Sequence, residues 1–246
     1  MQSPIKNSSL AKKLSGYKPS PAAIKLIKST RILFLVGPTG AGKDALKDEL
    51  LSTGNYHHIV SHTTREPRIN HGILEEDGRD YHFISKAEAE RMVDNKAFIE
   101  AKIYSGNLYG TSVAEIKLAH DQNLIAMTDI EVQGVAEYKE LDPNVMAVFL
   151  LPPDFKTWQQ RLTRRYGDVV DEVDHQMRLE TALVELDELI NTDYYVPVIN
   201  DDLNQTFAAV HKIVASKNHT SADAPRARAV AQQLDIDIRD YLQTLK

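Results

Sequence analysis

The fold is decided by the stretch Ile32-Leu33-Phe34-Leu35-Val36-Gly37-Pro38-Thr39-Gly40-Ala41-Gly42-Lys43-Asp44. Its first five residues are all apolar, which predicts a parallel strand buried on both faces. The next residues match the pattern Gly-x-x-x-x-Gly-Lys, and helix-forming residues follow over 44–51. In this pattern the glycines turn backbone N–H groups toward phosphate oxygens, the helix N-terminus adds partial positive charge, and Lys43 adds a full charge. The sequence therefore predicts a strand–loop–helix unit that binds phosphate.

This phosphate-binding loop, or P-loop, departs from its usual pattern at one position. After the lysine the pattern has Ser or Thr, whose hydroxyl coordinates Mg²⁺, whereas this chain has Asp44. A carboxylate can also bind Mg²⁺, but it places negative charge close to a triphosphate. Either Asp44 takes over the metal contact, or the metal is held elsewhere and more weakly.

The chain after the P-loop alternates between strand and helix patterns. Apolar runs predict strands at 124–128, 145–150 and 194–199. Helical patterns separate or follow them, at 113–121, 132–140, 155–165, 173–190 and 203–214. This alternation predicts an α/β fold, the three-layer P-loop NTPase fold, with a parallel central sheet.

The region 56–111 has a different pattern. It contains short strand-like pieces at 58–62, 81–84 and 98–103, with one helical stretch at 85–95. We expect these residues to form a small subdomain inserted into a domain that spans 31–216. We further expect His57, His58 and His62 to lie on one strand without forming a metal site, because no H-E-x-x-H pattern accompanies them.

Two tails flank this domain. Residues 1–30 form an N-terminal extension rich in Ser, Lys and Pro, which we interpret as a flexible arm or a docked helix that starts after Pro21. A targeting segment is the alternative, although transit peptides favour arginine and this stretch has none before Arg31. Residues 217–246 contain a polar linker and then a helix over 226–245 with a regular apolar stripe. That stripe predicts packing against the body or a partner chain.

Composition and charge exclude several classes of protein. The chain has 246 residues, no cysteine and a formal net charge of −6, so disulfide scaffolds and thiolate catalysis are excluded. Residues 1–43 carry eight basic side chains and no acidic ones, which leaves 21 basic and 35 acidic side chains elsewhere, a net −14. Such a body is a poor partner for nucleic acid. No apolar run reaches the ~20 residues that span a membrane, so we expect a cytoplasmic protein.

A second anion site is indicated by Ser61-His62-Thr63-Thr64-Arg65-Glu66-Pro67-Arg68. Its two arginines lie three residues apart after a strand, and arginine geometry suits bidentate binding of a phosphate. Further along the chain are Asp80-Tyr81-His82-Phe83, Phe98-Ile99-Glu100, Gly106-Asn107-Leu108-Tyr109-Gly110-Thr111 and Asp129-Ile130-Glu131-Val132-Gln133-Gly134.

In this order, these motifs and the P-loop resemble the guanylate kinase family of nucleoside monophosphate kinases, from about Arg31 to Val214. The resemblance implies a GMP-binding subdomain at 56–111, a helical lid at 161–178, and the reaction of ATP with GMP in purine nucleotide metabolism. It also implies Mg²⁺ and names site residues. The P-loop and Asn200 would bind ATP, with Asp44 and Asp129 near the metal. Residues for GMP would be Ser61, Arg65, Arg68, Tyr81, Glu100, Tyr109, Thr111 and Asp129. Catalytic charges would come from Lys43, Arg65, Arg161, Arg165 and Arg178.

The chain departs from the family pattern in two further places. The loop from Ile69 to Asp80 is about four residues longer than usual, and the lid loop lacks the usual Gly-Arg-Gly texture. Two other functions stay open. Gly-Lys-Asp also occurs in loops resembling the ribose bisphosphokinase of phosphonate breakdown, which phosphorylates a sugar phosphate. Non-catalytic modules resembling guanylate kinase bind phosphopeptides, although they tend to lose the P-loop. The sequence leaves the oligomeric state open.

Overall fold

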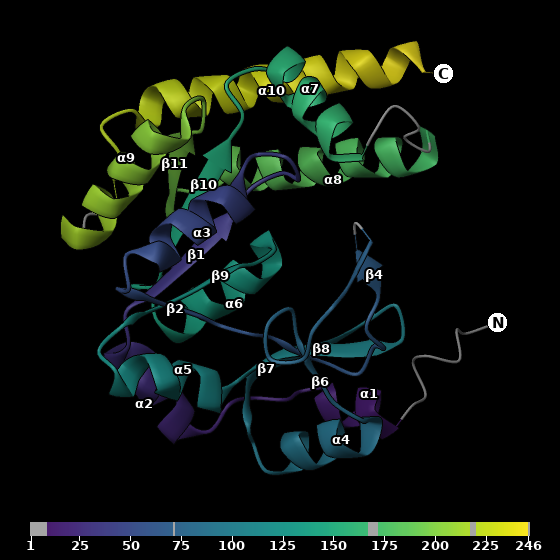
Figure 1. The fold of residues 1–246 in the computed structure, drawn as a ribbon, viewed down its shortest axis with the longest axis vertical. Helices are drawn as coiled ribbons and strands as arrows, with labels where there is room; N and C mark the ends of the chain where they lie inside the picture. The colour runs from purple at the N-terminus through teal and green to yellow at the C-terminus, as the bar shows by residue number, and fades with distance from the viewer. Residues whose placement is uncertain (1–8, 71, 167–171, 217–219, 246) are drawn as a thin grey trace. The chain divides into compact units, whose positions relative to one another are not determined.

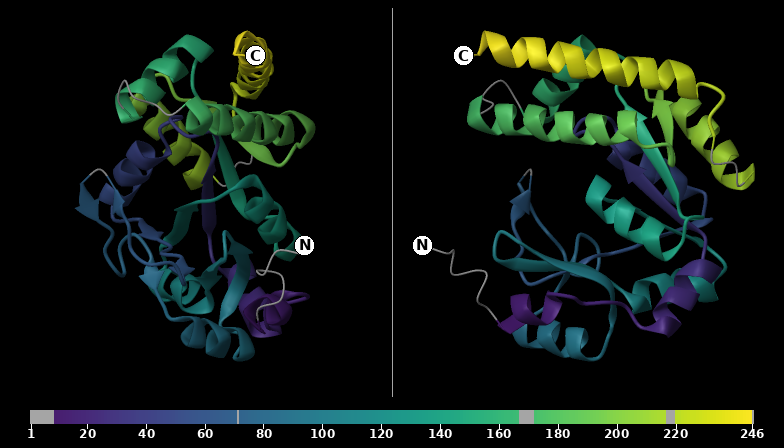
Figure 2. Two further views of the ribbon diagram at one scale, coloured as in Figure 1. Left: turned by 90° about the vertical axis from the view of Figure 1, so that its right-hand side faces the viewer. Right: turned by 180° about the vertical axis from the view of Figure 1, so that it is seen from behind.

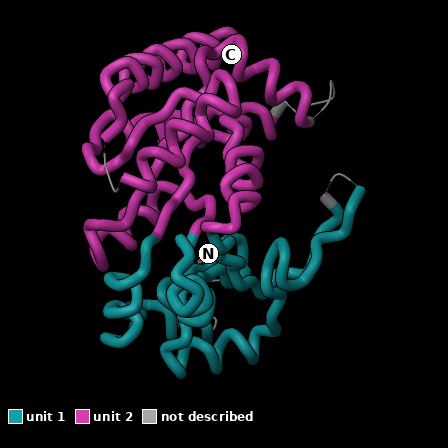
Figure 3. The backbone as a smooth tube through the Cα atoms, turned by 60° about the vertical axis from the view of Figure 1, so that its left-hand side comes forward, with its two compact units in different colours: residues 1–31, 56–126 teal, residues 32–55, 127–246 magenta. Residues whose placement is uncertain are grey.

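The computed structural model describes residues 9–70, 72–166, 172–216 and 220–245. It contains two compact units, which are coloured separately in Figure 3. Unit 1 comprises residues 1–31 and 56–126, and unit 2 comprises residues 32–55 and 127–246. The expected lid at 161–178 and linker after 216 lie in part outside the described residues.

A parallel sheet forms the centre of unit 2 (Figure 1). Its strands β1 (Ile32–Val36), β10 (Met146–Leu151) and β11 (Tyr195–Ile199) pair in parallel, with Leu35 opposite Val148. The full strand order is β11-β10-β1-β9-β2, where β9 is Ile125–Asp129 and β2 is Tyr56–His58. Of these, β2 and the first two residues of β9 belong to unit 1. Every residue of β1 and β10 is buried, as continuous apolar runs in a covered parallel sheet require.

Helices cover both faces of this sheet (Figure 2, left). On one face α3 (Lys43–Ser52) packs against α9 (Leu203–Ser216). On the other, α10 (Ala224–Thr244) packs on α8 (Glu172–Asn191) and also contacts α7 (Phe155–Tyr166). A further helix of this unit is α6 (Val132–Leu141). The predicted three-layer α/β class is confirmed, and α10 packs on the body.

Unit 1 is built on a four-stranded sheet with the order β6-β3-β8-β7. These strands are β3 (His62–Thr63), β6 (His82–Phe83), β7 (Phe98–Tyr104) and β8 (Asn107–Ser112). The helices of the unit are α1 (Ser9–Leu14), α2 (Pro21–Ser29), α4 (Lys86–Asp94) and α5 (Val113–Asp121). Both α4 and α5 begin where sequence rules expect, because the hydroxyls of Ser85 and Ser112 accept hydrogen bonds from the first helical turn.

The predicted strand over 58–62 is wrong. β2 ends at His58 and β3 begins only at His62, so the three histidines lie on two strands. The cause is a side chain: the carboxylate of Glu115 accepts the backbone N–H of Val60 at 2.9 Å, which takes that donor out of strand pairing. The long loop after Arg68 contains a short antiparallel pair, β4 (Ile69–Asn70) with β5 (Ile73–Leu74).

Among the described helices, none combines the length and the apolar character needed to cross a membrane.

Candidate active site

The P-loop lies between β1 and α3 in unit 2, and two of its glycines leave little room for a side chain. Gly37 has a φ of 123°, and a Cβ there would collide with the carbonyl oxygen of Leu150 on β10. Gly42 has a φ of 97°, and a Cβ there would collide with the side-chain amide of Asn200. Only glycine combines this backbone conformation with such a close approach. The loop therefore packs closely against Leu150 of β10 and against Asn200, which follows β11.

Side chains from elsewhere in unit 2 hold the loop in place. Trp158 donates its indole N–H to the carbonyl of Thr39 at 2.7 Å, and Asn200 donates to the carbonyl of Ala41 at 2.8 Å. The Asn200 amide oxygen accepts from the Thr206 hydroxyl at 3.0 Å, and Arg161 donates to the Asn200 backbone carbonyl at 2.9 Å. In this structure Asn200 thus supports the loop from behind, and Arg161 is anchored beside it.

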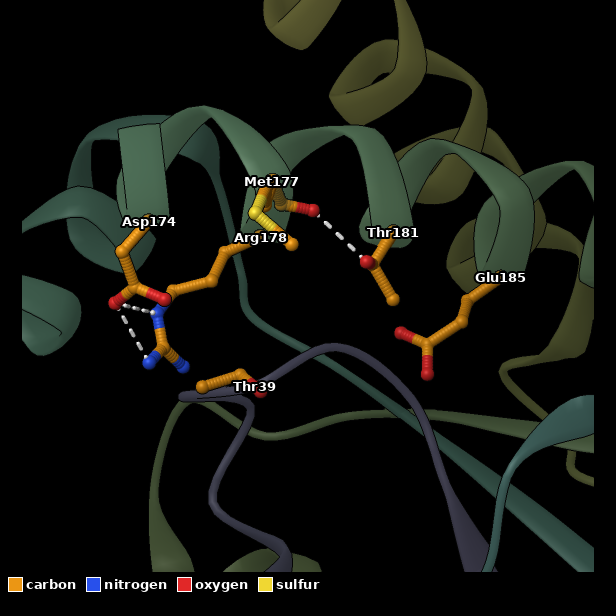
Figure 4. Close-up of a pocket in the computed structure, with 6 residues that line it drawn as sticks. All are labelled: Thr39, Asp174, Met177, Arg178, Thr181 and Glu185. Carbon is orange, nitrogen blue, oxygen red and sulfur yellow. Dashed lines mark hydrogen bonds and ion pairs between the residues drawn. The ribbon is translucent and has the colours of Figure 1, made fainter. Parts of the chain in front are cut away.

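Lys43 lies over the loop and has acidic neighbours. Its ammonium group donates to the backbone carbonyls of Gly37 and, at 3.3 Å, Pro38. Burial lowers the pKa of Lys43, and the carboxylate of Glu185 is the strongest of the charges that oppose this shift. Figure 4 shows this carboxylate directed from α8 toward the loop.

Glu185 is a further residue of this region, with no role predicted from the sequence. It lines a pocket of about 220 Å³ between α8 and the loop, together with Thr39, Asp174, Met177, Arg178 and Thr181. Burial raises the pKa of Glu185, and the nearby Lys43 partly offsets that effect. Arg178 reaches the same pocket, where it forms an ion pair of 2.8 Å with Asp174 (Figure 4).

The carboxylates of Asp44 and Asp129 both lie near the ammonium group of Lys47. Lys47, one turn after Lys43 on α3, has its ammonium nitrogen 3.2 Å from Asp129 and 3.8 Å from Asp44. Burial raises the pKa of Asp129, but the charges of Lys47 and Lys43 outweigh it and hold the pKa below its ordinary value. Asp44 also pairs with Arg165 of α7 at 3.1 Å. The unusual P-loop carboxylate thus contacts one of the expected lid arginines.

The residues expected to bind the second phosphate gather in unit 1 around Arg65. Its guanidinium donates to both carboxylate oxygens of Glu75, at 2.7 and 3.0 Å, and to the Tyr109 hydroxyl at 3.2 Å. It also lies over the Tyr81 ring, 5.2 Å from the ring centre. Glu75 further accepts the backbone N–H of Arg68 at 2.8 Å, while the Arg68 side chain is exposed.

Sequence reasoning missed Glu75. It stands after β5, in the long loop between the two quoted motifs 61–68 and 80–83, and so belongs to neither of them. The side chains of Arg65 and Glu75 are only 10% and 11% exposed, and the guanidinium is the largest influence that lowers the pKa of Glu75. A buried, bidentate pair of this kind fixes the orientation of the arginine.

The expected base-reading residues meet on β7 and β8. Glu100 lies opposite Thr111 in the strand register, and its carboxylate accepts the Thr111 backbone N–H at 3.0 Å. Thr111 is 3% exposed. Ser61 precedes β3, and its backbone carbonyl accepts the N–H of His82 at 2.9 Å. Of the expected residues, Ser61, Arg65, Arg68, Tyr81, Glu100, Tyr109 and Thr111 belong to unit 1, whereas the P-loop, Asp129, Arg161, Arg165, Arg178 and Asn200 belong to unit 2.

Three histidines of unit 1, His57, His62 and His82, lie near the buried carboxylate of Glu115. Glu115 pairs with His57 at 3.3 Å and with His82 at 3.0 Å. Although burial raises the pKa of Glu115, these bonds and the one from Val60 outweigh it and lower the pKa to about 2. His62 packs on His82 with ring centres 4.5 Å apart, and mainly through burial its pKa falls to about 4. No group of three or more metal-binding side chains occurs in the described part of the chain.

These shifts predict a protein that loses stability in mild acid. His62 takes up a proton near its ordinary pKa of 6.5 in the unfolded chain but only near 4 in the folded protein. Neutral His62 therefore adds fully to the free energy of unfolding above pH 6.5, and this stabilisation is lost as the pH falls toward 4. The loss amounts to up to about 3 kcal/mol. Glu115 adds a further loss as the pH falls from its ordinary 4.5 toward 2. We expect the Tm to fall between pH 7 and 4.5, and His62→Phe to remove most of that fall. Equal slopes of Tm against pH in both proteins would contradict this account.

Comparisons with known proteins place the chain in a family. A model of the guanylate kinase family matches residues 29–217. A guanylate kinase of Rickettsia bellii is 36% identical over 185 residues, which cover 74% of this chain and 92% of the relative. The guanylate kinase of Sus scrofa is 32% identical over 192 residues, which cover 77% of this chain and 94% of the relative.

A solved structure has the same fold. The crystal structure of guanylate kinase from Anaplasma phagocytophilum aligns with a TM-score of 0.56 and 24% identity, covering 80% of this chain and 92% of that one. The family model and the relatives both span most of this chain. The protein therefore belongs to the guanylate kinase family.

Proposed function

We propose that this protein transfers the γ-phosphate of ATP to GMP and so produces ADP and GDP. One observation carries the proposal: the same chain has a P-loop with a partly buried lysine in unit 2 and a partly buried Arg65–Glu75–Tyr109 group, together with the Glu100–Thr111 pair, in unit 1. The first set suits a triphosphate, and the second suits a nucleotide with one phosphate and a hydrogen-bonding base.

ATP would bind at the P-loop, residues 37–44. The backbone of the loop and the N-terminus of α3 offer N–H groups to phosphate oxygens, and Lys43 offers a charge to the β- and γ-phosphates. Asn200 would act by keeping the loop in shape, as its bond to the Ala41 carbonyl supports. Arg161, Arg165 and Arg178 would neutralise the charge that develops on the transferring group.

GMP would bind in unit 1. Arg65, oriented by Glu75, would meet its phosphate together with Arg68, Ser61, Tyr81 and Tyr109. Glu100, held by the Thr111 amide, would accept hydrogen bonds from the N1–H and 2-amino group of guanine. Adenine has no N–H at N1 and no amino group at C2. The Glu100 carboxylate, enclosed against adenine, would lack those two donors, and the cost of leaving its oxygens unpaired there exceeds what one good hydrogen bond contributes.

The reaction needs no side-chain base. An oxygen of the GMP phosphate is already anionic, so it can attack the γ-phosphorus directly. A bond from this oxygen to the γ-phosphorus forms while the bond from phosphorus to the ADP oxygen breaks. The protein then contributes position and charge neutralisation, through Lys43 and the arginines. When the nucleotides bind, Arg165 would leave Asp44 and contact phosphate. Because the Arg165–Asp44 ion pair is exposed to solvent, breaking it costs little free energy.

Mg²⁺ fits the residues that the chain provides. Asp44 and Asp129 both reach the Lys47 ammonium nitrogen, so two carboxylates already converge on one cation. Mg²⁺ in proteins binds through one or two carboxylates and fills its other positions with water and substrate phosphates. We propose that Asp44 and Asp129 hold the ion, either directly or through water. When bound, it would neutralise charge on the β- and γ-phosphates.

The variant Asp44→Ser tests this role of Asp44. The substitution exchanges a charged oxygen ligand for the neutral hydroxyl of the usual pattern, and because a carboxylate binds Mg²⁺ more strongly than a hydroxyl does, we expect the Mg²⁺ concentration for half-maximal activity to rise about tenfold. Asp48→Ser is the matched control, since Asp48 is exposed one turn further along α3. A lower Mg²⁺ requirement in Asp44→Ser would show that Asp44 hinders the metal.

The reaction itself is tested by incubating the protein with ATP and GMP and separating the products. The proposal predicts that ADP and GDP appear in equal amounts. ADP without GDP would mean hydrolysis of ATP, and GMP binding without turnover would favour a non-catalytic binding module. Turnover of ribose 1,5-bisphosphate in place of GMP would favour the phosphosugar kinase.

A further inference from the structure

The N-terminal extension contacts the strand that carries Glu100. Helix α1 lies against α4 and β7 within unit 1. Leu10 is 6% exposed and belongs to a hydrophobic cluster with Ala89, Val93, Phe98 and Leu108. Lys13 adds an ion pair of 2.6 Å to Asp94 at the end of α4. These residues precede position 29, where the match to the family model begins. The extension is thus a feature of this chain that the family pattern does not supply.

Tyr17 makes the most specific of these contacts. α1 ends at Leu14, and Gly16 adopts a φ of 82°, a left-handed conformation that turns the chain after a helix. The Tyr17 hydroxyl then donates to the carbonyl of Phe98 at 2.8 Å and accepts the N–H of the same residue at 3.2 Å. The Lys96 ammonium lies over the Tyr17 ring, 4.5 Å from its centre. One hydroxyl therefore serves both polar groups of a single backbone position.

This position lies at the edge of the sheet and at an irregularity in it. β7 is the last strand in the order β6-β3-β8-β7, so one side of its backbone has no neighbouring strand in that sheet. The register runs from Phe98 opposite Ser112 to Glu100 opposite Thr111, which leaves Ile99 as an extra residue, a β-bulge. A bulge changes the direction of the side chains that follow it. Here the next side chain is Glu100.

We infer that Tyr17 is a positioning residue for Glu100: by binding both polar groups of Phe98, it fixes the bulge that directs the carboxylate toward guanine. This inference rests on the proposed function, in which Glu100 accepts hydrogen bonds from guanine. Tyr17 acts in place of a fifth strand at the one point where the edge strand is irregular. The N-terminal extension thereby contributes to base recognition without contacting the base.

The test compares Tyr17→Phe with Lys13→Ala. The first removes only the hydroxyl and keeps the ring against the hydrophobic cluster, whereas the second weakens the docking of α1 and leaves the bonds to Phe98 intact. GMP and IMP binding are measured by calorimetry, and the KM for ATP, the kcat and the Tm are measured beside them. IMP lacks the 2-amino group, so the preference for GMP over IMP reports the alignment of the carboxylate.

For Tyr17→Phe we expect GMP to bind about tenfold more weakly, since two hydrogen bonds to backbone are lost. We also expect a several-fold loss of preference for GMP over IMP, with the KM for ATP unchanged. In a protein that already carries Glu100→Gln, Tyr17→Phe should not weaken GMP binding further. A double-mutant cycle of the two substitutions measures this coupling. Unchanged GMP binding and preference would overturn the inference. So would a parallel loss of ATP and GMP affinity together with a lowered Tm, which indicates a purely structural role.

Calorimetry separates this inference from the proposed function, because binding needs no turnover. If the wild-type protein binds GMP but forms no GDP, the proposed function fails while the role of Tyr17 is still decided by the binding data. If GDP forms and Tyr17→Phe binds GMP like the wild type, the inference fails alone.

Discussion

Replacing Lys43 by methionine is expected to reduce kcat/KM for the ATP–GMP reaction by a factor on the order of 10³, or about 4 kcal/mol of transition-state stabilisation. The ammonium group is held over the P-loop by the carbonyls of Gly37 and Pro38. Methionine has a similar length but can neither donate a hydrogen bond nor carry charge. Because Glu185 lies close to Lys43, its carboxylate would then face the ATP phosphates without compensation.

Steady-state kinetics with both substrates measure this effect, and the Tm shows whether the variant folds. Lys212→Met is the matched control, since Lys212 is exposed on α9, and it should leave the rate unchanged. If Lys43→Met is folded and keeps more than a tenth of the wild-type kcat/KM, the P-loop lysine has no central role. A second variant, Glu185→Gln, keeps the shape of the neighbouring carboxylate and should affect the rate far less than Lys43→Met.

The second large effect is expected for Glu100→Gln. A carboxylate can accept from both the N1–H and the 2-amino group of guanine, whereas an amide offers one oxygen and an NH₂ group that faces a donor. Hydrogen bonds to charged groups contribute about 1.5–3 kcal/mol each, so kcat/KM for GMP should fall by a factor on the order of 10²–10³. The KM for ATP should stay unchanged, because Glu100 belongs to unit 1 and the P-loop to unit 2.

Rates with GMP and AMP are compared for Glu100→Gln, the wild type and the control Glu140→Gln, a change at an exposed glutamate of α6. We expect the ratio of the GMP rate to the AMP rate to fall only in Glu100→Gln, because the rate with GMP falls. A Glu100→Gln protein that keeps its wild-type preference would place base recognition elsewhere.

Much of the fold could be predicted because its signals are local. The apolar run at Ile32–Val36 forms β1 with those bounds, and α5 has the predicted bounds as well. Long helices such as α8 were predicted to within a residue or two at each end, since a strong helical period determines them. The P-loop could be located for the same reason, because its glycines and lysine are contiguous in sequence.

Features that depend on distant residues could not be predicted. The interruption between β2 and β3 depends on Glu115, which lies far along the chain from Val60. The pairs Arg65–Glu75 and Lys43–Glu185 likewise join segments that no pattern relates. The docking of α1 was detectable in principle, because Leu10, Leu14 and Tyr17 have the spacing of one helical face. That apolar stripe is short and surrounded by Ser and Lys, so the sequence alone does not indicate that it packs against α4 and β7.

The most direct test of the whole account is the rate of ADP formation with ATP and each of GMP, AMP, CMP and UMP, measured at equal concentration. We expect rapid turnover with GMP and rates at least about 100-fold lower with the other three, since none of their bases would present the Glu100 carboxylate with the two adjacent donors of guanine. Equal rates with all four, or a preferred substrate other than GMP, would contradict it.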